Sequence, residues 1–175
     1  AEMKFRKTEA ADLDGVMEII RQAQDSLKAR GVDQWQNGSP DRPAIEADIA
    51  RGWSYVLADG ERVLGTAAIS FAGEPTYDTI SQGSWRGEGA YAVMHRVAVR
   101  EGCKGEGLAG RLVSAAADLC RAQGVGQIRI DTHRQNASMQ RMLEKNGFVY
   151  CGIILLQDGA EAGAERLCFD KLLEA

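Results

Sequence analysis

The stretch YAVMHRVAVREGCKGEGLAGRL, residues 91–112, decides the fold of this chain. Its first part, Tyr91 to Val99, is mostly apolar and rich in β-branched side chains, which predicts a largely buried strand. Glycines at positions 102, 105, 107 and 110 follow and lead into a segment rich in Ala and Leu, which predicts a loop and then a helix. A glycine loop at a helix start presents backbone N–H groups and the positive end of the helix dipole to an anion.

Length and composition predict one globular domain over residues 1–175, because 45% of the residues are hydrophobic and can form a sizeable core. No apolar run approaches the roughly 18 residues of a membrane span, and we find no signal-peptide pattern, so we expect a cytoplasmic protein without a membrane partner. The formal charge of −4 argues against general nucleic-acid binding. The four cysteines form no CxxC pair and only two histidines are present, which favours reduced thiols and no metal site.

Hydrophobic periodicity and turn residues predict elements in the order β-α-α-β-β-β-α-β-α-β-β. This order indicates the α/β class, with a mixed sheet and helices on both of its faces. Residues 32–40 and 72–89 remain as loops, and the second is long enough to suggest a functional role. The helices are expected near 12–30, 44–51, 108–124 and 136–146, and the strands near 4–8, 55–58, 63–71, 91–99, 127–131, 150–156 and 165–172.

The glycine loop is compatible with three phosphate-binding patterns. Gly105 to Gly110 spells G-x-G-x-x-G, and Asp131 follows about 20 residues later, as in dinucleotide-binding oxidoreductases. Against this, five residues separate Val99 from Gly105, and the 65 residues after Gly110 are too few for the remaining sheet of such a domain. A P-loop is excluded because no Gly-Lys-Ser/Thr follows the glycines. The third pattern, Lys104 to Ala109, places a cation before small residues at a helix start, which suits a pyrophosphate.

The third pattern resembles the acyl-CoA site of the GNAT superfamily of N-acetyltransferases. The later segment Asn136 to Phe148 is similar to the next helix of that family, which ends in Glu-Lys-x-Gly-Phe. The two segments have the order and separation found in the family, and the element order extends the resemblance over the whole chain. The resemblance implies a mixed, mostly antiparallel sheet of about seven strands, splayed between its central strands and covered by helices on both faces.

The resemblance also implies an acetyl-CoA site, with the cofactor lying between the strands at 91–99 and 127–131. Backbone groups of the first strand would hold the pantetheine arm, the glycine loop would hold the pyrophosphate, and Asn136 would hydrogen-bond the cofactor. The cofactor-binding residues implied are Val97, Ala98, Val99, Lys104, Gly105, Glu106, Gly107, Leu108, Ala109, Gly110 and Asn136.

In the family the acceptor, usually a primary amine, attacks the thioester directly, which requires a base and stabilisation of an oxyanion. A backbone N–H near Val97 would serve the oxyanion. Asp131 stands where some relatives carry a catalytic Glu, and His95, two residues before Val97 and expected on the same strand face, is its rival as the base. Structural roles are equally open: Asp131 could cap the next helix or pair with Arg134, and His95 could be a hydrogen-bonded core residue.

One position departs from the family pattern. Many relatives place a Tyr in the last helix as the acid for the leaving thiolate, and the aligned residue here is Leu143. Three alternatives follow: the proton comes from Tyr77, Tyr150 or water, the thiolate leaves unassisted, or the domain is a non-catalytic acyl-CoA-binding sensor.

The acceptor site is expected in the loops that vary within the family. Trp35, Tyr77 and Trp85 lie in these loops and suggest aromatic walls around a small molecule. The acidic chain favours cationic acceptors. The partners expected are therefore a small-molecule amine, no nucleic acid and no membrane, with a homodimer as the self-association to consider.

Overall fold

The computed structural model describes residues 2–103, 105–159 and 161–174. Its centre is a seven-stranded sheet in the order β1-β2-β3-β4-β5-β7-β6, in which only the β4–β5 pair is parallel. The strands are β1 (Met3–Lys7), β2 (Ser54–Asp59), β3 (Arg62–Ser70), β4 (Ala92–Val99), β5 (Gln127–Thr132), β6 (Val149–Leu155) and β7 (Glu165–Leu172). The helices are α1 (Leu13–Ala29), α2 (Arg42–Arg51), α3 (Leu108–Ala122) and α4 (Ala137–Lys145), with short 3₁₀ turns η1 (Ala10–Asp12) and η2 (Pro75–Thr79).

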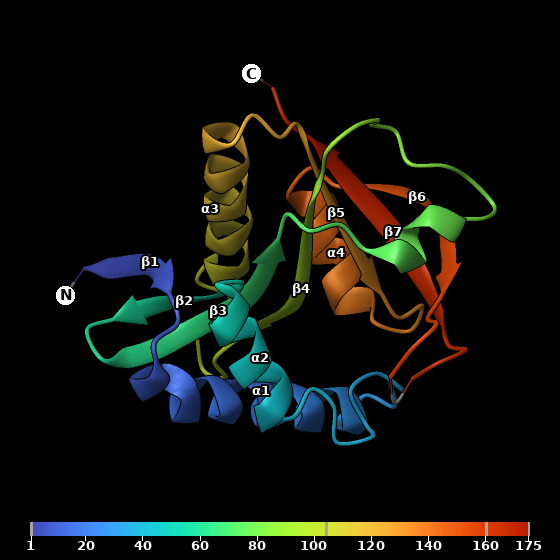
Figure 1. Ribbon diagram of the computed structural model, residues 1–175. Coiled ribbons are helices and arrows are strands. Elements are labelled where there is room, and N and C mark those ends of the chain that lie inside the picture. The colour runs from blue at the N-terminus through green and yellow to red at the C-terminus, as the bar shows by residue number, and fades with distance from the viewer. Residues whose placement is uncertain (1, 104, 160, 175) are drawn as a thin grey trace.

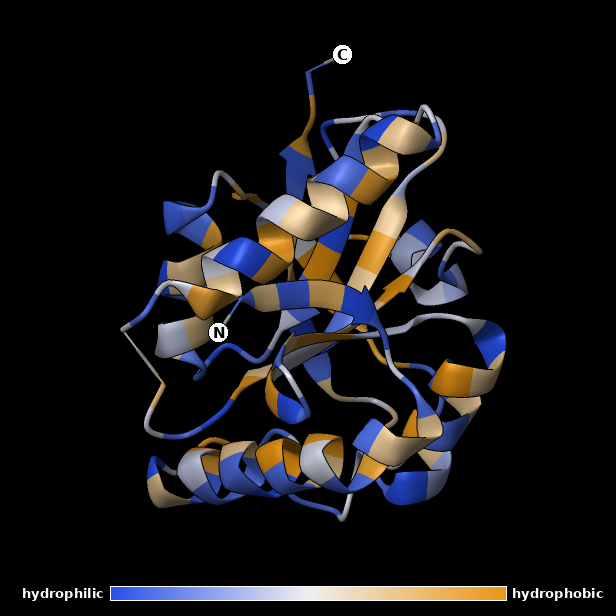
Figure 2. Cartoon of the chain, turned by 90° about the vertical axis from the view of Figure 1, so that its left-hand side faces the viewer, coloured by the Kyte–Doolittle hydropathy of each residue, from blue (hydrophilic) through white to orange (hydrophobic). Residues whose placement is uncertain are grey.

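Helices cover both faces of the sheet. Successive strand residues point to opposite sides, and the strands carry apolar residues on both sides, so each face has to be buried. On β2, Tyr55 and Leu57 pack into the core that contains α3 and α4. Val56 and Ala58 point the other way and pack against α1 and α2. Figure 1 shows these layers, and Figure 2 shows the banding of hydrophobic and hydrophilic residues along the helices. The predicted fold class, a mixed and mostly antiparallel sheet with helices on both faces, is confirmed.

The central strands separate soon after they meet. Parallel pairing between β4 and β5 is confined to Ala92 with Ile128 and Val93 with Arg129. Beyond these pairs β5 continues along β7, where Thr132 still pairs with Leu167, while β4 continues along β3. The backbone of β4 therefore loses its partner on one side, which leaves room for a ligand between the two strands.

A β-bulge at Arg96 adds to this opening. The register between β3 and β4 passes from Ala68 with His95 to Thr66 with Ala98, so β4 carries one extra residue. Arg96 has the left-handed φ of 52°, which residues other than glycine adopt at a cost. Its guanidinium is held by the buried carboxylate of Asp48 on α2, with hydrogen bonds of 2.7 Å from Nε and 2.8 Å from Nη2.

The bulge also corrects one expectation from the sequence. Val97 packs in the same core cluster as Ala92 and Met94, whereas Val93 packs on the other face. His95 follows Val93 at the regular two-residue spacing, so it shares the face of Val93. The prediction that His95 and Val97 share a strand face is wrong, because strict alternation does not anticipate a bulge between them.

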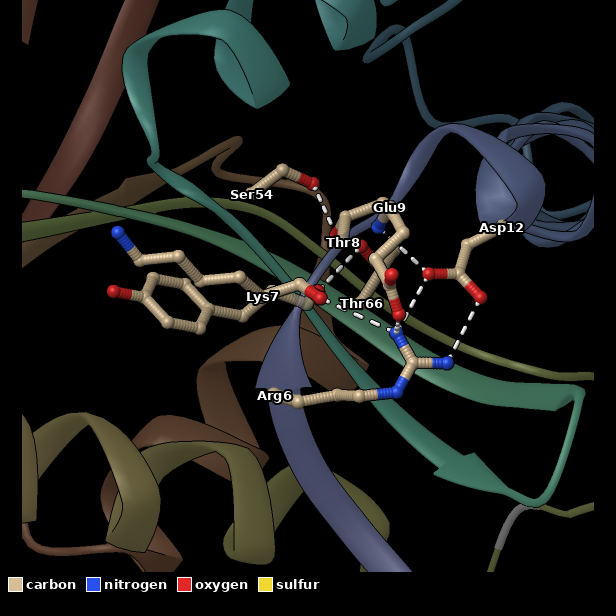
Figure 3. Close-up of polar contacts among 8 residues, drawn as sticks. Arg6, Lys7, Thr8, Glu9, Asp12, Ser54 and Thr66 are labelled. Carbon is tan, nitrogen blue, oxygen red and sulfur yellow. Dashed lines mark hydrogen bonds and ion pairs between the residues drawn. The ribbon is translucent and has the colours of Figure 1, made fainter.

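The corner between β1 and α1 is fixed by charge (Figure 3). Arg6 donates to both carboxylate oxygens of Asp12, at 2.7 and 3.0 Å, and Asp12 also accepts from the Glu9 N–H at 2.7 Å. Asp12 stands at the N-cap position of α1, as expected, but its side chain makes no hydrogen bond to that helix. The Arg6 guanidinium holds the pKa of Asp12 below its usual value.

The long loop before β4 is packed against the sheet over much of its length. Ser81 forms a bridge with Ile153 on β6, and Asp170, fully buried on β7, accepts from the Arg86 N–H at 2.8 Å and from Arg86 Nε at 2.6 Å. The guanidinium of Arg129 lies 4.5 Å from the ring centroid of Trp85 and 3.9 Å from that of Tyr91. Within the described ranges, no helix is long and apolar enough to cross a membrane.

Candidate active site

A groove of about 740 Å³ runs along the end of β4 that is no longer paired with β5, between the C-terminal half of α1 and the helices α3 and α4. Val97, Ala98 and Val99, which were predicted to bind the cofactor, form its strand wall. Arg96 and Val97 fall in the gap of the β3–β4 register, and on its other side this part of β4 is no longer paired with β5. This arrangement suits an extended molecule that binds to the strand through main-chain hydrogen bonds.

The glycine loop closes one end of the groove with an uncapped helix start. Gly107 is the N-cap of α3 and has no side chain to satisfy the first N–H groups of the helix. Leu108, Ala109 and Gly110, which carry those groups, all line the groove together with Gly105 and Gly107. Free N–H groups and the helix dipole favour an anion at this point.

Gly105 and Gly107 are required by the backbone rather than by packing. Their φ angles are 87° and 72°, and a Cβ added at either position would meet nothing within 4 Å. Glu106 between them is exposed and does not line the groove. Lys104, the cation expected before these glycines, lies outside the described residues.

Cations that the motif analysis missed also face the groove. Arg141 and Lys145 stand one turn apart on α4, and Arg30 comes from the C-terminal end of α1. Phosphate groups bind Arg and Lys strongly, so these side chains extend the anion site beyond the helix start. The spacing of Arg141 and Lys145 beside the apolar Met142 is the sequence signal that could have identified them.

Asn136 lines the groove, but its side chain already has two protein partners. Its carbonyl oxygen accepts from the Met139 N–H at 3.2 Å and caps α4, and its amide donates to Gln34 Oε1 at 3.0 Å. Asn136 therefore connects the α1–α2 loop to α4 across the groove.

A second cavity of about 260 Å³ shares Gln34, Trp35, Val97 and Met139 with the groove. Trp35, one of the expected aromatic walls, thus stands at the junction of the two spaces. The cavity also brings together both candidate bases and several charged side chains, namely Glu74, His95, Arg96, Asp131, Asp158, Glu161 and Arg166. Among the described residues, no group of three or more His, Cys, Asp or Glu side chains could hold a metal ion.

Asp131 on β5 is oriented by a hydrogen bond from Tyr77. The Tyr77 hydroxyl donates to Asp131 Oδ2 at 2.6 Å, and the Tyr77 side chain is almost fully buried. Burial raises the pKa of Asp131, a shift that the Tyr77 hydrogen bond and the charge of Arg166 oppose. The alternative pairing with Arg134 is not formed, because Arg134 binds Glu165 at 2.5 Å. A carboxylate with a raised pKa at a cavity wall is suited to accept a proton.

His95 lines the same cavity, but its pKa is shifted in the opposite direction. Its Nε2 atom is buried without a hydrogen-bond partner among the described residues. Burial lowers the pKa of His95 to about 4, and the neighbouring Arg96 charge acts in the same direction. The imidazole is therefore neutral at pH 7 and a weaker base than an ordinary histidine.

The other expected aromatic walls, Tyr77 and Trp85, do not line either cavity. Their rings are in contact at a centroid distance of 5.0 Å and are tilted by 49°, and Trp85 Nε1 donates to the Tyr77 carbonyl at 2.9 Å. They form the packing behind Asp131. Leu143 is fully buried in the core, and Tyr150 packs on Phe169 with 47% of its surface exposed, away from both cavities.

We expect Gly107→Ala to weaken acetyl-CoA binding about tenfold, because a left-handed backbone costs a Cβ-bearing residue about 1–2 kcal/mol and the helix start would shift to relieve it. Gly124→Ala is the matched control, since Gly124 follows α3 at φ 70° with equally open space and lies outside the groove. Calorimetric titration measures both affinities. Equal affinities for the two variants would contradict the role assigned to the loop.

The fold and the groove define a class: an α/β domain whose sheet splits between its two parallel strands and whose groove ends at an uncapped helix start. The sequence pattern of the Acetyltransferase (GNAT) family matches residues 18–148. The chain belongs to this family.

Solved structures agree with this assignment. A GNAT-family acetyltransferase from Streptococcus agalactiae is 31% identical, with a TM-score of 0.87 over 99% of this chain and 96% of that one. An acetyltransferase from Salmonella typhimurium, solved with acetyl-CoA, is 19% identical with a TM-score of 0.67 over 100% and 96%. The PaiA N-acetyltransferase from Thermoplasma acidophilum, solved with coenzyme A, is 15% identical with a TM-score of 0.72 over 98% and 99%. The comparison with curated proteins gave no match.

Proposed function

We propose that this chain transfers the acetyl group of acetyl-CoA to the primary amine of a small molecule. The observation that carries the proposal is the junction at Val97, where a groove suited to CoA meets a second cavity that contains Asp131. The volume of the second cavity, about 260 Å³, suits a small acceptor rather than a protein surface.

The residues of the groove fit the cofactor. The glycine loop and the first turn of α3 would hold the pyrophosphate, Arg141 and Lys145 would neutralise phosphate charge, and the β4 backbone would hold the pantetheine arm. When bound, acetyl-CoA supplies an activated thioester carbonyl at the junction of the two cavities.

Different groups near that junction would stabilise the oxyanion and accept the proton. We assign the stabilisation of negative charge on the carbonyl oxygen to the backbone N–H of Val97, a residue without a register partner on β3. Asp131 accepts a proton from the acceptor nitrogen, and the Tyr77 hydroxyl keeps the carboxylate oriented. Leu143 can donate no proton, so the return of a proton to the thiol side rests on Asp131 and water.

A direct test measures thiol release from acetyl-CoA with a panel of small amines. We expect turnover with at least one of them, together with acetyl-CoA binding by calorimetry and none of NAD. Binding of acetyl-CoA without thiol release on any amine would favour the second candidate function, an acyl-CoA sensor, which the buried Leu143 at the acid position supports.

A further inference from the structure

A carboxylate already lies in the acceptor cavity, and it belongs to the chain itself. Glu161 is in the turn between β6 and β7, and its Oε1 atom accepts a hydrogen bond from the Trp35 backbone N–H at 3.0 Å. Its Oε2 atom forms an ion pair with the guanidinium of Arg166. All three residues line the acceptor cavity.

The groups that hold this carboxylate are fixed by the fold. Arg166 is part of β7 and only 3% exposed, and its Nη1 donates to the Glu165 carbonyl at 3.1 Å. A guanidinium so deeply buried is costly unless an anion accompanies it. Trp35 has a φ of 62°, a strained conformation for a residue with a side chain, and such strain is typical of binding sites.

Glu161, in contrast, reaches the site from a surface turn. The turn contains Gly159 and Gly163, whose φ angles of 85° and 86° are left-handed. The Glu161 carboxylate is tied to the protein only through Arg166 and the Trp35 N–H among the contacts of the described residues. A free carboxylate could therefore replace it without rearrangement of the sheet.

Asp131 provides the opposite charge in the same cavity. Its carboxylate and the Arg166 guanidinium are close enough to shift each other's pKa through their charges. The other cation of the cavity, Arg96, is already bound on two nitrogens by Asp48. Asp131 for an amine, and Arg166 with the Trp35 N–H for a carboxylate, make the cavity complementary to an amino acid, and Glu74 and Asp158 are further carboxylates in its lining.

We propose that Arg166 and the Trp35 N–H form a carboxylate subsite and that Glu161 fills it in the absence of substrate. The acceptor is then an amino acid, an inference that rests on the proposed acetyl transfer. The acceptor's carboxylate displaces Glu161 and binds Arg166. Its amine then lies toward Asp131. Glu161 thereby acts as a built-in competitor for the subsite.

The test compares L-amino acids with the amines that lack only their carboxylate, with L-lysine against cadaverine and L-phenylalanine against 2-phenylethylamine among the pairs. We expect kcat/KM to be at least about tenfold higher for an accepted amino acid than for its paired amine, since a hydrogen-bonded charge pair is worth at least that much. A second measurement needs no turnover: calorimetric binding of the same compounds to protein saturated with CoA.

Variants connect the preference to the subsite. Glu161→Gln should lower the KM for amino acids about threefold to tenfold, because a neutral amide competes less well for Arg166, and should not lower the KM for the paired amines. Glu165→Gln is the control, since Glu165 is an exposed neighbour that pairs with Arg134 outside the cavity. The double variant Arg166→Gln/Glu161→Gln removes both charges together, which avoids an unpaired buried ion, and should abolish the preference for amino acids.

Equal use of amino acids and their paired amines would overturn the proposal. So would a preference for cadaverine over L-lysine, which would indicate a dicationic acceptor, or the absence of amino-acid binding to the CoA-saturated protein. A failure of the proposed acetyl transfer looks different. In that case no compound releases thiol, while calorimetry still decides whether the carboxylate subsite exists.

Discussion

Asp131→Asn is expected to lower kcat by about 10²–10⁴-fold, the usual contribution of a general base, while acetyl-CoA affinity stays unchanged. Asn retains an oxygen that can accept from the Tyr77 hydroxyl, so the local packing is preserved, but it cannot take a proton from the acceptor. Asp131 also lies outside the groove proposed for CoA, which is why acetyl-CoA binding should be spared. Steady-state kinetics and calorimetric titration measure the two effects.

The pH dependence follows from the same carboxylate. Asp131 must be ionised to accept a proton, and burial raises its pKa above the ordinary value of 3.8. Activity should therefore fall as the pH drops through this raised pKa, and Asp131→Asn should remove that limb from its residual activity. Because burial disfavours the charged form, the free energy of unfolding falls as Asp131 ionises with rising pH. Asp131→Asn removes this charge and should therefore abolish that loss of stability.

His95→Gln is the discriminating companion variant. The native His95 lines the same cavity as Asp131, but its pKa of about 4 makes it a weak proton acceptor at neutral pH. We expect His95→Gln to reduce kcat less than tenfold, well short of the Asp131→Asn effect. The reverse result, a large loss in His95→Gln and near-normal activity in Asp131→Asn, would transfer the role of base to His95.

Arg96→Ala is expected to lower the free energy of unfolding by about 3–5 kcal/mol, because it leaves the carboxylate of Asp48 buried without its charged partner. Asp48 is only 1% exposed and cannot recover water in place of the lost hydrogen bonds. For a domain of this size each kcal/mol corresponds to roughly 2–4 °C in Tm. Urea denaturation followed by circular dichroism measures the change.

A double variant separates the effect of the Arg96 charge on stability from the effect of its left-handed backbone. Asp48→Asn/Arg96→Gly removes both charges and places glycine where φ is 52°, so it should recover most of the lost stability and preserve the bulge. Arg121→Ala is the control, because its partner Asp118 lies on the exposed surface of α3 and should change stability by no more than about 0.5 kcal/mol. A double variant no more stable than Arg96→Ala would disprove this account of the ion pair.

The cofactor side of the site could be predicted from the sequence because its determinants are local. A buried strand, glycines with left-handed backbone and a helix start lie within one continuous stretch, and neighbours in the chain stay neighbours in the fold. Val97, Ala98, Val99 and the residues from Gly107 to Gly110 line the groove for that reason. Arg30 comes from another helix, so no local pattern indicated it.

The acceptor side depends on contacts between residues far apart in the chain. The Tyr77–Asp131 hydrogen bond joins η2 to β5, and the Asp48–Arg96 pair joins α2 to β4. The aromatic residues Tyr77 and Trp85 were expected as walls because they lie in a long loop, but the loop packs on the sheet and turns them toward Asp131 and Arg129. Composition and periodicity carry no information about such orientation.

By itself the sequence determined the order of the elements, the mixed sheet and the glycine loop before a helix start at residues 105–110, since these follow from hydrophobic periodicity and glycine backbone preferences. Only the tertiary structure decided how the acceptor cavity is built. The bulge at Arg96 sends His95 and Val97 to different faces, and the β6–β7 turn brings Glu161 onto Arg166. These arrangements arise from sheet register and long-range ion pairs, which depend on where distant segments meet rather than on any one stretch of the chain.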